Sequence, residues 1–223
     1  DGAIDDYEEL YNAKLVEKTG VQERVFGEDF DDALSAEYGL LAHQIIECWA
    51  EIIDLHIETS RPVITIGLDE LICRVVENRN LEKDIVRRFF QAFSLYPRDE
   101  WSEPPEGFSF RDIAPWKFKR RLSCLLKPIL QISDDEVFLS LSLISLGAPY
   151  FLHRAKEGKF NTEFFNSTVM RSYIGSMIEK RGADFTKLVA SKLEAEGWYV
   201  RIEVLMTTVG ASQELGDIDV LAI

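Results

Sequence analysis

The sequence has few residues that could form a disulfide framework or a zinc site: three cysteines and three histidines among 223 residues. Cys48, Cys73 and Cys124 lie far apart and form no C-x-x-C pair, and the histidines are scattered as well. This spacing argues against structural zinc and predicts a reducing environment, which we take to be the cytoplasm. No apolar run approaches the roughly 20 residues of a membrane span, so no membrane partner is expected.

The motifs of several common enzyme classes are also missing. The sequence contains no G-x-x-x-x-G-K-[ST] or G-x-G-x-x-G loop for phosphates, and no G-x-S-x-G turn for a nucleophilic serine. P-loop nucleotide hydrolysis and serine-hydrolase chemistry therefore find no support in the sequence.

Charge is unevenly distributed along the chain, whose net charge is −14. Residues 1–60 hold sixteen acids and three bases, whereas residues 61–223 hold 23 acids and 22 bases. An acidic surface repels phosphate, so we expect any nucleic-acid surface to lie outside the first 60 residues. A simpler interpretation, a solvated and solubilising face, also fits this segment.

Hydrophobic periodicity predicts that residues 1–165 form a mostly helical domain. Residues 29–58 are expected to form one long helix, because apolar residues recur at alternating spacings of four and three. This seam consists of Leu34, Tyr38, Leu41, Ile45, Cys48, Ile52 and Leu55. It either packs on the rest of its own domain or pairs with a protein partner in a two-chain coiled coil.

A β-hairpin near residues 123–142 is expected within this domain. Two β-rich runs predict it, residues 125–132 and 136–142, and Pro128 suggests that the first run is an edge strand. Before it, residues 68–78 and 81–93 are expected to form a helix pair that also resembles a helix-turn-helix.

One compact cluster interleaves basic and aromatic residues, at Trp116, Lys117, Lys119, Arg120 and Arg121. Lysine and arginine supply phosphate contacts, and an aromatic ring can stack on a base. We therefore take these five residues as the candidate DNA-binding residues. An ordinary basic surface, anchored to the core by its aromatic side chains, is the alternative interpretation.

An acidic strand is expected at residues 217–223. In a strand, residues two apart point to the same side, so Asp217 and Asp219 share one face while Ile218 and Val220 line the other. Carboxylates at the start of a buried strand suit a divalent cation, because hard cations take oxygen ligands. Asp217 and Asp219 are therefore the candidate ligands for Mg²⁺.

The sequence Gly-Asp-Ile-Asp-Val-Leu-Ala at this strand resembles the first acidic motif of the PD-(D/E)XK, or restriction-endonuclease-like, nucleases. The preceding residues fit, because a helical stretch leads into Gly182, an amphipathic helix follows, and Gly197 ends it before a strand over 198–205. The resemblance covers residues 170–223. It implies that Asp219 is a catalytic Mg²⁺ ligand and that the activity is metal-assisted hydrolysis of DNA phosphodiesters.

Two departures from the family pattern qualify this resemblance. Thr186 stands where many relatives place a metal-directed glutamate, and no (D/E)-x-K strand follows Asp219. Because the sequence also begins at Asp1 without methionine, we expect a piece of a longer nuclease, acting in genome defence or repair, that is itself inactive. The alternatives are a helical interaction or scaffold module with an inactive nuclease-like segment, and a DNA binder that uses the helix pair at 68–93.

The expected fold is therefore α+β overall. A mainly helical domain with a hairpin spans residues 1–165, and residues 166–223 form the start of a small α/β, restriction-endonuclease-like domain. The sequence does not specify an oligomeric state.

Overall fold

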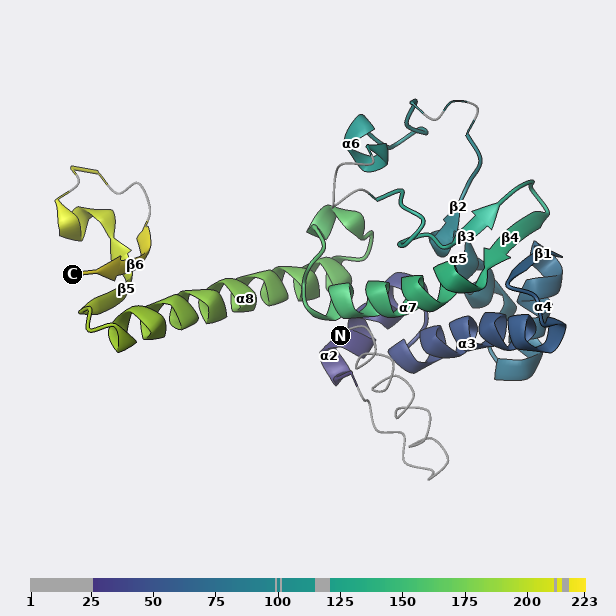
Figure 1. Cartoon of the computed structure of the whole chain (residues 1–223), viewed down its shortest axis with the longest axis horizontal. Coiled ribbons are helices and arrows are strands. Elements are labelled where there is room, and N and C mark those ends of the chain that lie inside the picture. The colour runs from purple at the N-terminus through teal and green to yellow at the C-terminus, as the bar shows by residue number, and fades with distance from the viewer. Residues whose placement is uncertain (1–25, 99, 101, 115–120, 211, 214–216) are drawn as a thin grey trace, which may run out of the picture. The chain divides into compact units, whose positions relative to one another are not determined.

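The computed structural model describes residues 26–98, 100, 102–114, 121–210, 212–213 and 217–223. The chain divides into two compact units, Asp1–Ile174 and Gly175–Ile223, each described here by itself. The predicted boundary, after residue 165, lies just before helix α8 (Thr168–Ala195), whereas the units divide within this helix. Helices and small sheets together confirm the α+β fold class (Figure 1).

The predicted long helix over 29–58 is two helices, α2 (Glu28–Tyr38) and α3 (Ala42–Thr59). Gly39 separates them with a φ of 78°, in the left-handed region that glycine enters without steric cost. The Asp31 carboxylate then accepts a hydrogen bond from the Ala42 N–H, at 2.9 Å, and so satisfies an otherwise unpaired donor at the start of α3.

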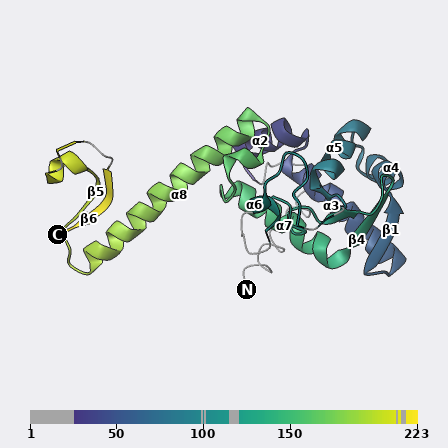
Figure 2. The same ribbon diagram turned by 90° about the horizontal axis from the view of Figure 1, so that it is seen from above.

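The apolar seam of these two helices lies in the core of the first unit. All of its residues except Leu41 are buried. Helices α3 and α7 (Leu141–Lys156) lie side by side, as two views of the chain show (Figures 1 and 2). The seam therefore packs on its own domain, and a second chain could pair along it only if this core opened.

A four-stranded sheet lies beside these helices, in the order β1-β4-β3-β2. β4 pairs antiparallel with both β1 and β3, and β2 pairs parallel with β3. The strands are β1 (Val63–Gly67), β2 (Ser94–Leu95), β3 (Ile129–Gln131) and β4 (Glu136–Ser140). The predicted hairpin is confirmed as β3–β4, but its first strand is not an edge strand. Pro128 precedes β3 and so costs the sheet no hydrogen bond.

The predicted helix pair is confirmed as α4 (Leu68–Arg79) and α5 (Lys83–Phe93). Asn80, with a φ of 52°, ends α4 in the left-handed region, which asparagine tolerates better than most residues. Helix α5 is strongly amphipathic and buries Val86, Phe89, Phe90 and Phe93. A short helix, α6 (Phe110–Ile113), follows in the long connection to β3.

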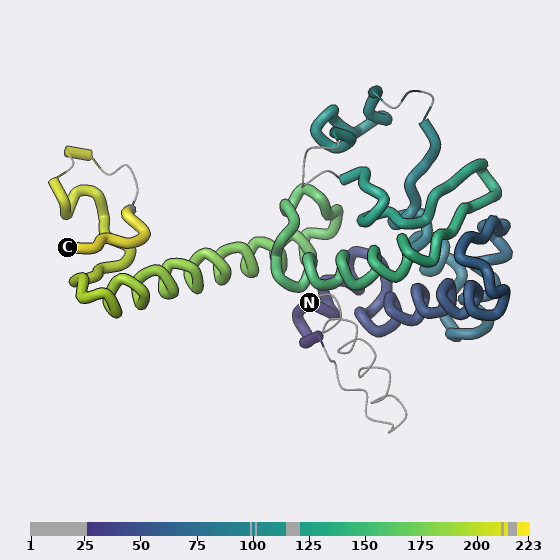
Figure 3. Tube along the Cα trace, in the orientation of Figure 1, coloured from purple at the N-terminus to yellow at the C-terminus, as the bar shows by residue number. Residues whose placement is uncertain are grey.

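Helix α8 continues through the position where Gly182 was expected to begin a new helix (Figure 3). Its start is fixed by the carboxylate of Glu37, which accepts hydrogen bonds from the N–H groups of Asn166 and Ser167 at 2.7 to 3.0 Å. A short 3₁₀ helix, η2 (Thr162–Phe164), precedes this point. A carboxylate at a helix N-terminus is favoured by both the free N–H groups and the helix dipole.

The second unit consists of the remainder of α8, β5 (Val200–Leu205), the 3₁₀ helix η3 (Met206–Val209) and β6 (Asp217–Ala222). β5 and β6 pair antiparallel, and Gly197, with a φ of 90°, follows the end of α8. The predicted strands are thus confirmed. None of the helices in the described part of the chain has the length and apolarity needed to cross a bilayer.

Helix α7 approaches the segment before β3 so closely that only glycine fits at position 147. A Cβ atom there would lie 2.9 Å from the Leu125 carbonyl oxygen and 3.0 Å from Pro128 Cγ. We expect Gly147→Ala to lower the free energy of unfolding by about 1–2 kcal/mol, because a tightly packed core resists added volume. The measurement is urea denaturation followed by circular dichroism.

Gly175→Ala is the matched control, because Gly175 also lies inside a helix but a Cβ atom added to it would meet nothing within 4 Å. It should gain about 0.5–1 kcal/mol from helix propensity. Equal effects of the two substitutions would contradict the close approach at Gly147.

Lys127 gives the stability of the first unit a distinctive pH dependence. Its ammonium group donates to the Ala92 carbonyl oxygen at 2.6 Å, and burial lowers the pKa of Lys127 to about 8. The folded protein therefore loses this proton at a lower pH than the unfolded chain, so stability rises from pH 8 toward the ordinary lysine pKa. Between about pH 8 and pH 10.5 the wild type should gain about 2–3 kcal/mol relative to Lys127→Met. The free energies of unfolding of the wild type and Lys127→Met are measured in urea across this pH range. If they change in parallel with pH, the lowered pKa of Lys127 is contradicted.

Candidate functional site

Asp219 lies in the middle of β6, and its side chain is exposed. Its neighbours Ile218 and Val220 pair with Val204 and Ile202, so Asp219 lies at the level of Glu203 on β5, although these two residues do not form a ladder pair themselves. Val204 is buried, whereas Glu203 is exposed. Two exposed acidic residues therefore belong to the same part of the hairpin, at a point where the regular pairing of the two strands is interrupted.

Glu203 also has an unusual backbone. Its φ of 52° lies in the left-handed region, where a residue with a Cβ is strained by roughly 1–2 kcal/mol. Strain of this kind persists only where surrounding structure imposes it, and it is frequent at functional sites. The hairpin therefore combines a strained acidic residue, Glu203, with an exposed aspartate, Asp219, at the same level of the two strands.

The acidic hairpin fits the requirements of Mg²⁺ in part. Mg²⁺ commonly binds through one or two carboxylates together with waters and substrate phosphates, and Asp219 and Glu203 supply two carboxylates. Asp217 begins β6 and pairs with Leu205. Among the residues that the structure describes, no group of three or more His, Cys, Asp or Glu side chains is arranged to hold a metal ion. Substrate or further oxygen ligands would have to complete the site.

Of the five candidate DNA-binding residues, Arg121 alone is described; Trp116, Lys117, Lys119 and Arg120 lie outside the described residues. The Arg121 guanidinium makes a two-pronged ion pair with Asp112, with N–O distances of 2.8 and 2.9 Å. It also lies over the Phe108 ring, 4.6 Å from the ring centroid. These hydrogen bonds from Arg121 hold the pKa of Asp112 well below its usual range.

Arg121 forms part of the wall of a cavity of about 150 Å³, which we call the basic cavity. Its four cationic residues come from α6, from the segment before β3, and from α7 and the loop that follows it. The lining residues are Arg111, Arg121, Arg154, Lys159, Asp112, Glu163, Ser109, Asn161, Tyr150, Phe160, Phe164 and Leu126.

Arg154 is the central cation of the basic cavity. Its Nη atoms donate to the Tyr150 hydroxyl at 3.1 Å and to the Lys159 carbonyl oxygen at 2.6 Å, and its Nε makes no hydrogen bond within the described structure. The guanidinium lies 5.3 Å from the Tyr150 ring centroid and 5.4 Å from that of Phe160. Phe160 in turn stacks on Phe164 at 4.7 Å.

Sequence reasoning identified only one of these cations. Arg154 and Lys159 are separated from Arg121 by more than thirty residues, and only the packing of α7 against the preceding segment brings them together. The basic and aromatic residues around Phe160 were the one sign of this cavity in the sequence. On their own, however, such residues are also typical of the C-terminal end of a helix, where cations are favoured.

The helix pair α4–α5 does not carry the basic surface that a DNA-reading helix needs. Arg87 is paired with Asp69 at 2.7 Å, and the exposed residues Lys83, Asp84 and Arg88 on α5 are of mixed charge. Phosphate contacts from such a helix require unpaired cations on one face. The described residues therefore give the helix-turn-helix interpretation no support.

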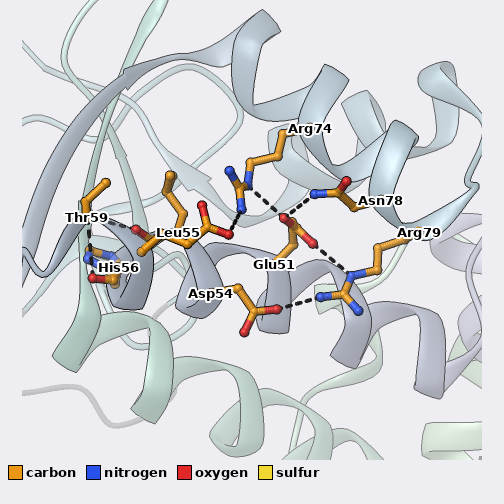
Figure 4. Close-up of polar contacts among 9 residues, drawn as sticks. Glu51, Asp54, Leu55, His56, Thr59, Arg74, Asn78 and Arg79 are labelled. Atoms are coloured by element: carbon orange, nitrogen blue, oxygen red, sulfur yellow. Dashed lines mark hydrogen bonds and ion pairs between the residues drawn. The ribbon is translucent and has the colours of Figure 1, made fainter.

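A second dense charge cluster lies between α3 and α4 and is satisfied internally (Figure 4). The Glu51 carboxylate, which is buried, accepts hydrogen bonds from Arg74 at 2.7 Å, Asn78 at 2.7 Å and Arg79 at 3.0 Å. Arg79 also pairs with Asp54. Because these contacts occupy the buried carboxylate, the cluster holds the two helices together rather than binding a ligand.

Replacement of Glu51 should therefore be costly. Glu51→Ala leaves two arginines without their shared buried partner, and we expect a loss of about 3 kcal/mol in the free energy of unfolding. Glu58→Ala is the control, because Glu58 also binds Arg74 but is largely exposed; it should cost less than about 1 kcal/mol. Chemical denaturation of both variants tests this, and similar losses would refute a special role for Glu51.

The chain is thus an α+β protein with a basic cavity in its first unit and an acidic hairpin in its second. The family model described as anti-phage protein Upx-like matches residues 6–223, so the chain belongs to the Upx-like family of anti-phage proteins. No curated protein and no solved structure matches the chain.

Proposed function

We propose that the chain is part of a metal-dependent nuclease that cleaves phage DNA in anti-phage defence, and that its second unit supplies the first acidic element of the nuclease site. The observation that carries this proposal is the exposed Asp219 on β6, which lies at the level of the strained acidic residue Glu203 on β5. The order of helix α8, β5 and β6 also agrees with the opening elements of the PD-(D/E)XK nucleases that the sequence resembles.

In this proposal the residues of the hairpin hold and orient the reacting phosphate. Asp219 and Glu203 would hold Mg²⁺, with Asp217 as a further candidate at the start of β6. When bound, the metal supplies charge neutralisation at the phosphate and lowers the pKa of a water molecule. The apolar partners of the strand, of which Val204 is buried, fix the direction in which the exposed face of β6 points.

Asp219→Asn tests the proposal in cells and in solution. The variant should lose protection against phage, measured as efficiency of plating, because removal of a metal ligand commonly costs at least tenfold in metal affinity or activity. Purified protein should bind Mn²⁺, followed by its electron paramagnetic resonance signal, more weakly by a similar factor. Asp184→Asn, an exposed acid on α8, is the matched control and should behave as the wild type.

A second candidate function is a protein-interaction module with an inactive nuclease-like unit. The second unit exposes large apolar side chains, with Phe185 66%, Trp198 52% and Tyr199 67% exposed. Large apolar side chains that remain exposed are a feature of interaction surfaces. Full protection by Asp219→Asn, together with loss of protection by Trp198→Ser, would reject the nuclease and favour this module.

A further inference from the structure

The basic cavity holds more positive charge than its own acidic residues neutralise. Asp112 is occupied by Arg121, and Lys159 is paired with Glu157. In the part of the chain that the structure describes, Glu163, the other carboxylate of the lining, forms no ion pair with these cations, although its charge also acts on Arg121. Arg154 is half-buried, and its two Nη contacts are to a hydroxyl and a carbonyl oxygen rather than to a carboxylate. Arg111, on α6, makes no ion pair among the described residues. A partly desolvated cation without a counter-charge is unfavourable unless an anion completes the site.

The size of the cavity and the chemical character of its wall also limit which ligands it can bind. At about 150 Å³ it is smaller than the roughly 300–1,000 Å³ of pockets that hold drug-sized ligands. It therefore accommodates the phosphate group of a ligand, while the rest of that ligand lies at the mouth of the cavity. Phe164, which is half-buried and stacked on Phe160, supplies an aromatic surface beside the cations.

Guanidinium groups and a neighbouring aromatic face are the features that recognise a nucleoside phosphate. Arginine donors match the geometry of phosphate oxygens, and a base of any sequence can stack on a phenylalanine ring. Ser109 and Asn161 add neutral polar groups to the lining. A simple acidic peptide would not use the aromatic surface, and an apolar ligand would leave the cations unpaired.

We propose that the basic cavity binds the terminal phosphate of a nucleoside phosphate, with Arg111 and Arg154 on the phosphate and Phe164 against the base. The ligand is either a free nucleotide or the phosphorylated end of a single strand, since both present the same group. This site lies entirely within the first unit, so its ligand binding does not depend on Asp219 or on the proposed nuclease activity.

Fluorescence anisotropy of the full chain tests this proposal, with a six-nucleotide DNA strand labelled at its 3′ end. The strand with a 5′-phosphate should bind at least tenfold more tightly than the same strand with a 5′-hydroxyl. Adenosine monophosphate should compete with it, whereas adenosine should not. Binding of adenosine monophosphate alone, without binding of the strand, would identify the free nucleotide as the source of the phosphate and would equally support the site.

Arg111→Gln is the informative variant, because Arg111 is exposed and its replacement should leave the fold intact. It should weaken binding of the phosphorylated probe about tenfold, the effect of one charge-assisted hydrogen bond. Arg61→Gln, at an exposed arginine of the same unit that does not line the cavity, should leave binding unchanged, as should Asp219→Asn. The proposal is overturned if neither the 5′-phosphorylated strand nor adenosine monophosphate binds more tightly than its unphosphorylated counterpart, or if Arg61→Gln weakens binding as much as Arg111→Gln.

Discussion

The first unit depends on a continuous series of aromatic contacts that runs from its centre to the basic cavity. Trp49 on α3 contacts Phe93 on α5 at 5.3 Å between ring centroids, Phe93 contacts Phe151 on α7 at 4.8 Å, and Phe151 contacts Phe160 at 5.8 Å. Phe160 then stacks on Phe164 at the cavity wall. Edge-to-face and offset pairs of this kind are worth about 0.5–1.5 kcal/mol each beyond the area that they bury. The packing that closes the core therefore also fixes the position of the cavity's aromatic surface and of Arg154.

The acidic character of the N-terminal segment is largely structural where the chain is described. Asp31 caps α3, Glu37 binds the N–H groups at the start of α8, and Glu51 joins α3 to α4. Each carboxylate satisfies donors that would otherwise be unpaired, so these acids are not interchangeable solubilising residues. Because these three carboxylates are paired with donors of the fold, an acidic segment with few bases can still supply much of the core.

Periodicity predicted most elements of the fold, and glycine caused the main errors. The apolar spacing was correct on both sides of Gly39, yet the predicted helix is interrupted there. Helix α8, in contrast, continues through Gly182, where a new helix was expected to begin. Glycine costs a helix only about 1 kcal/mol, so packing decides whether the helix ends. The acidic strand was found because its residues are adjacent in sequence. The basic cavity was not found, because Arg111, Arg154 and Lys159 meet only in three dimensions.

The two candidate sites would bind phosphate in different ways, the cavity directly through cations and the hairpin through a metal ion held by carboxylates. They also differ in how firmly their residues are held. The cavity uses cations positioned by a buried aromatic core, so its geometry exists before a ligand binds. The hairpin β5–β6 is a two-stranded sheet in which Val204 is buried while Ile202 and Leu205 are 43% and 52% exposed. Such sheets are marginally stable without added packing. The carboxylates of Asp219 and Glu203 are therefore held only by this small hairpin. A cation bound to the folded hairpin, and not to the unfolded chain, would stabilise it.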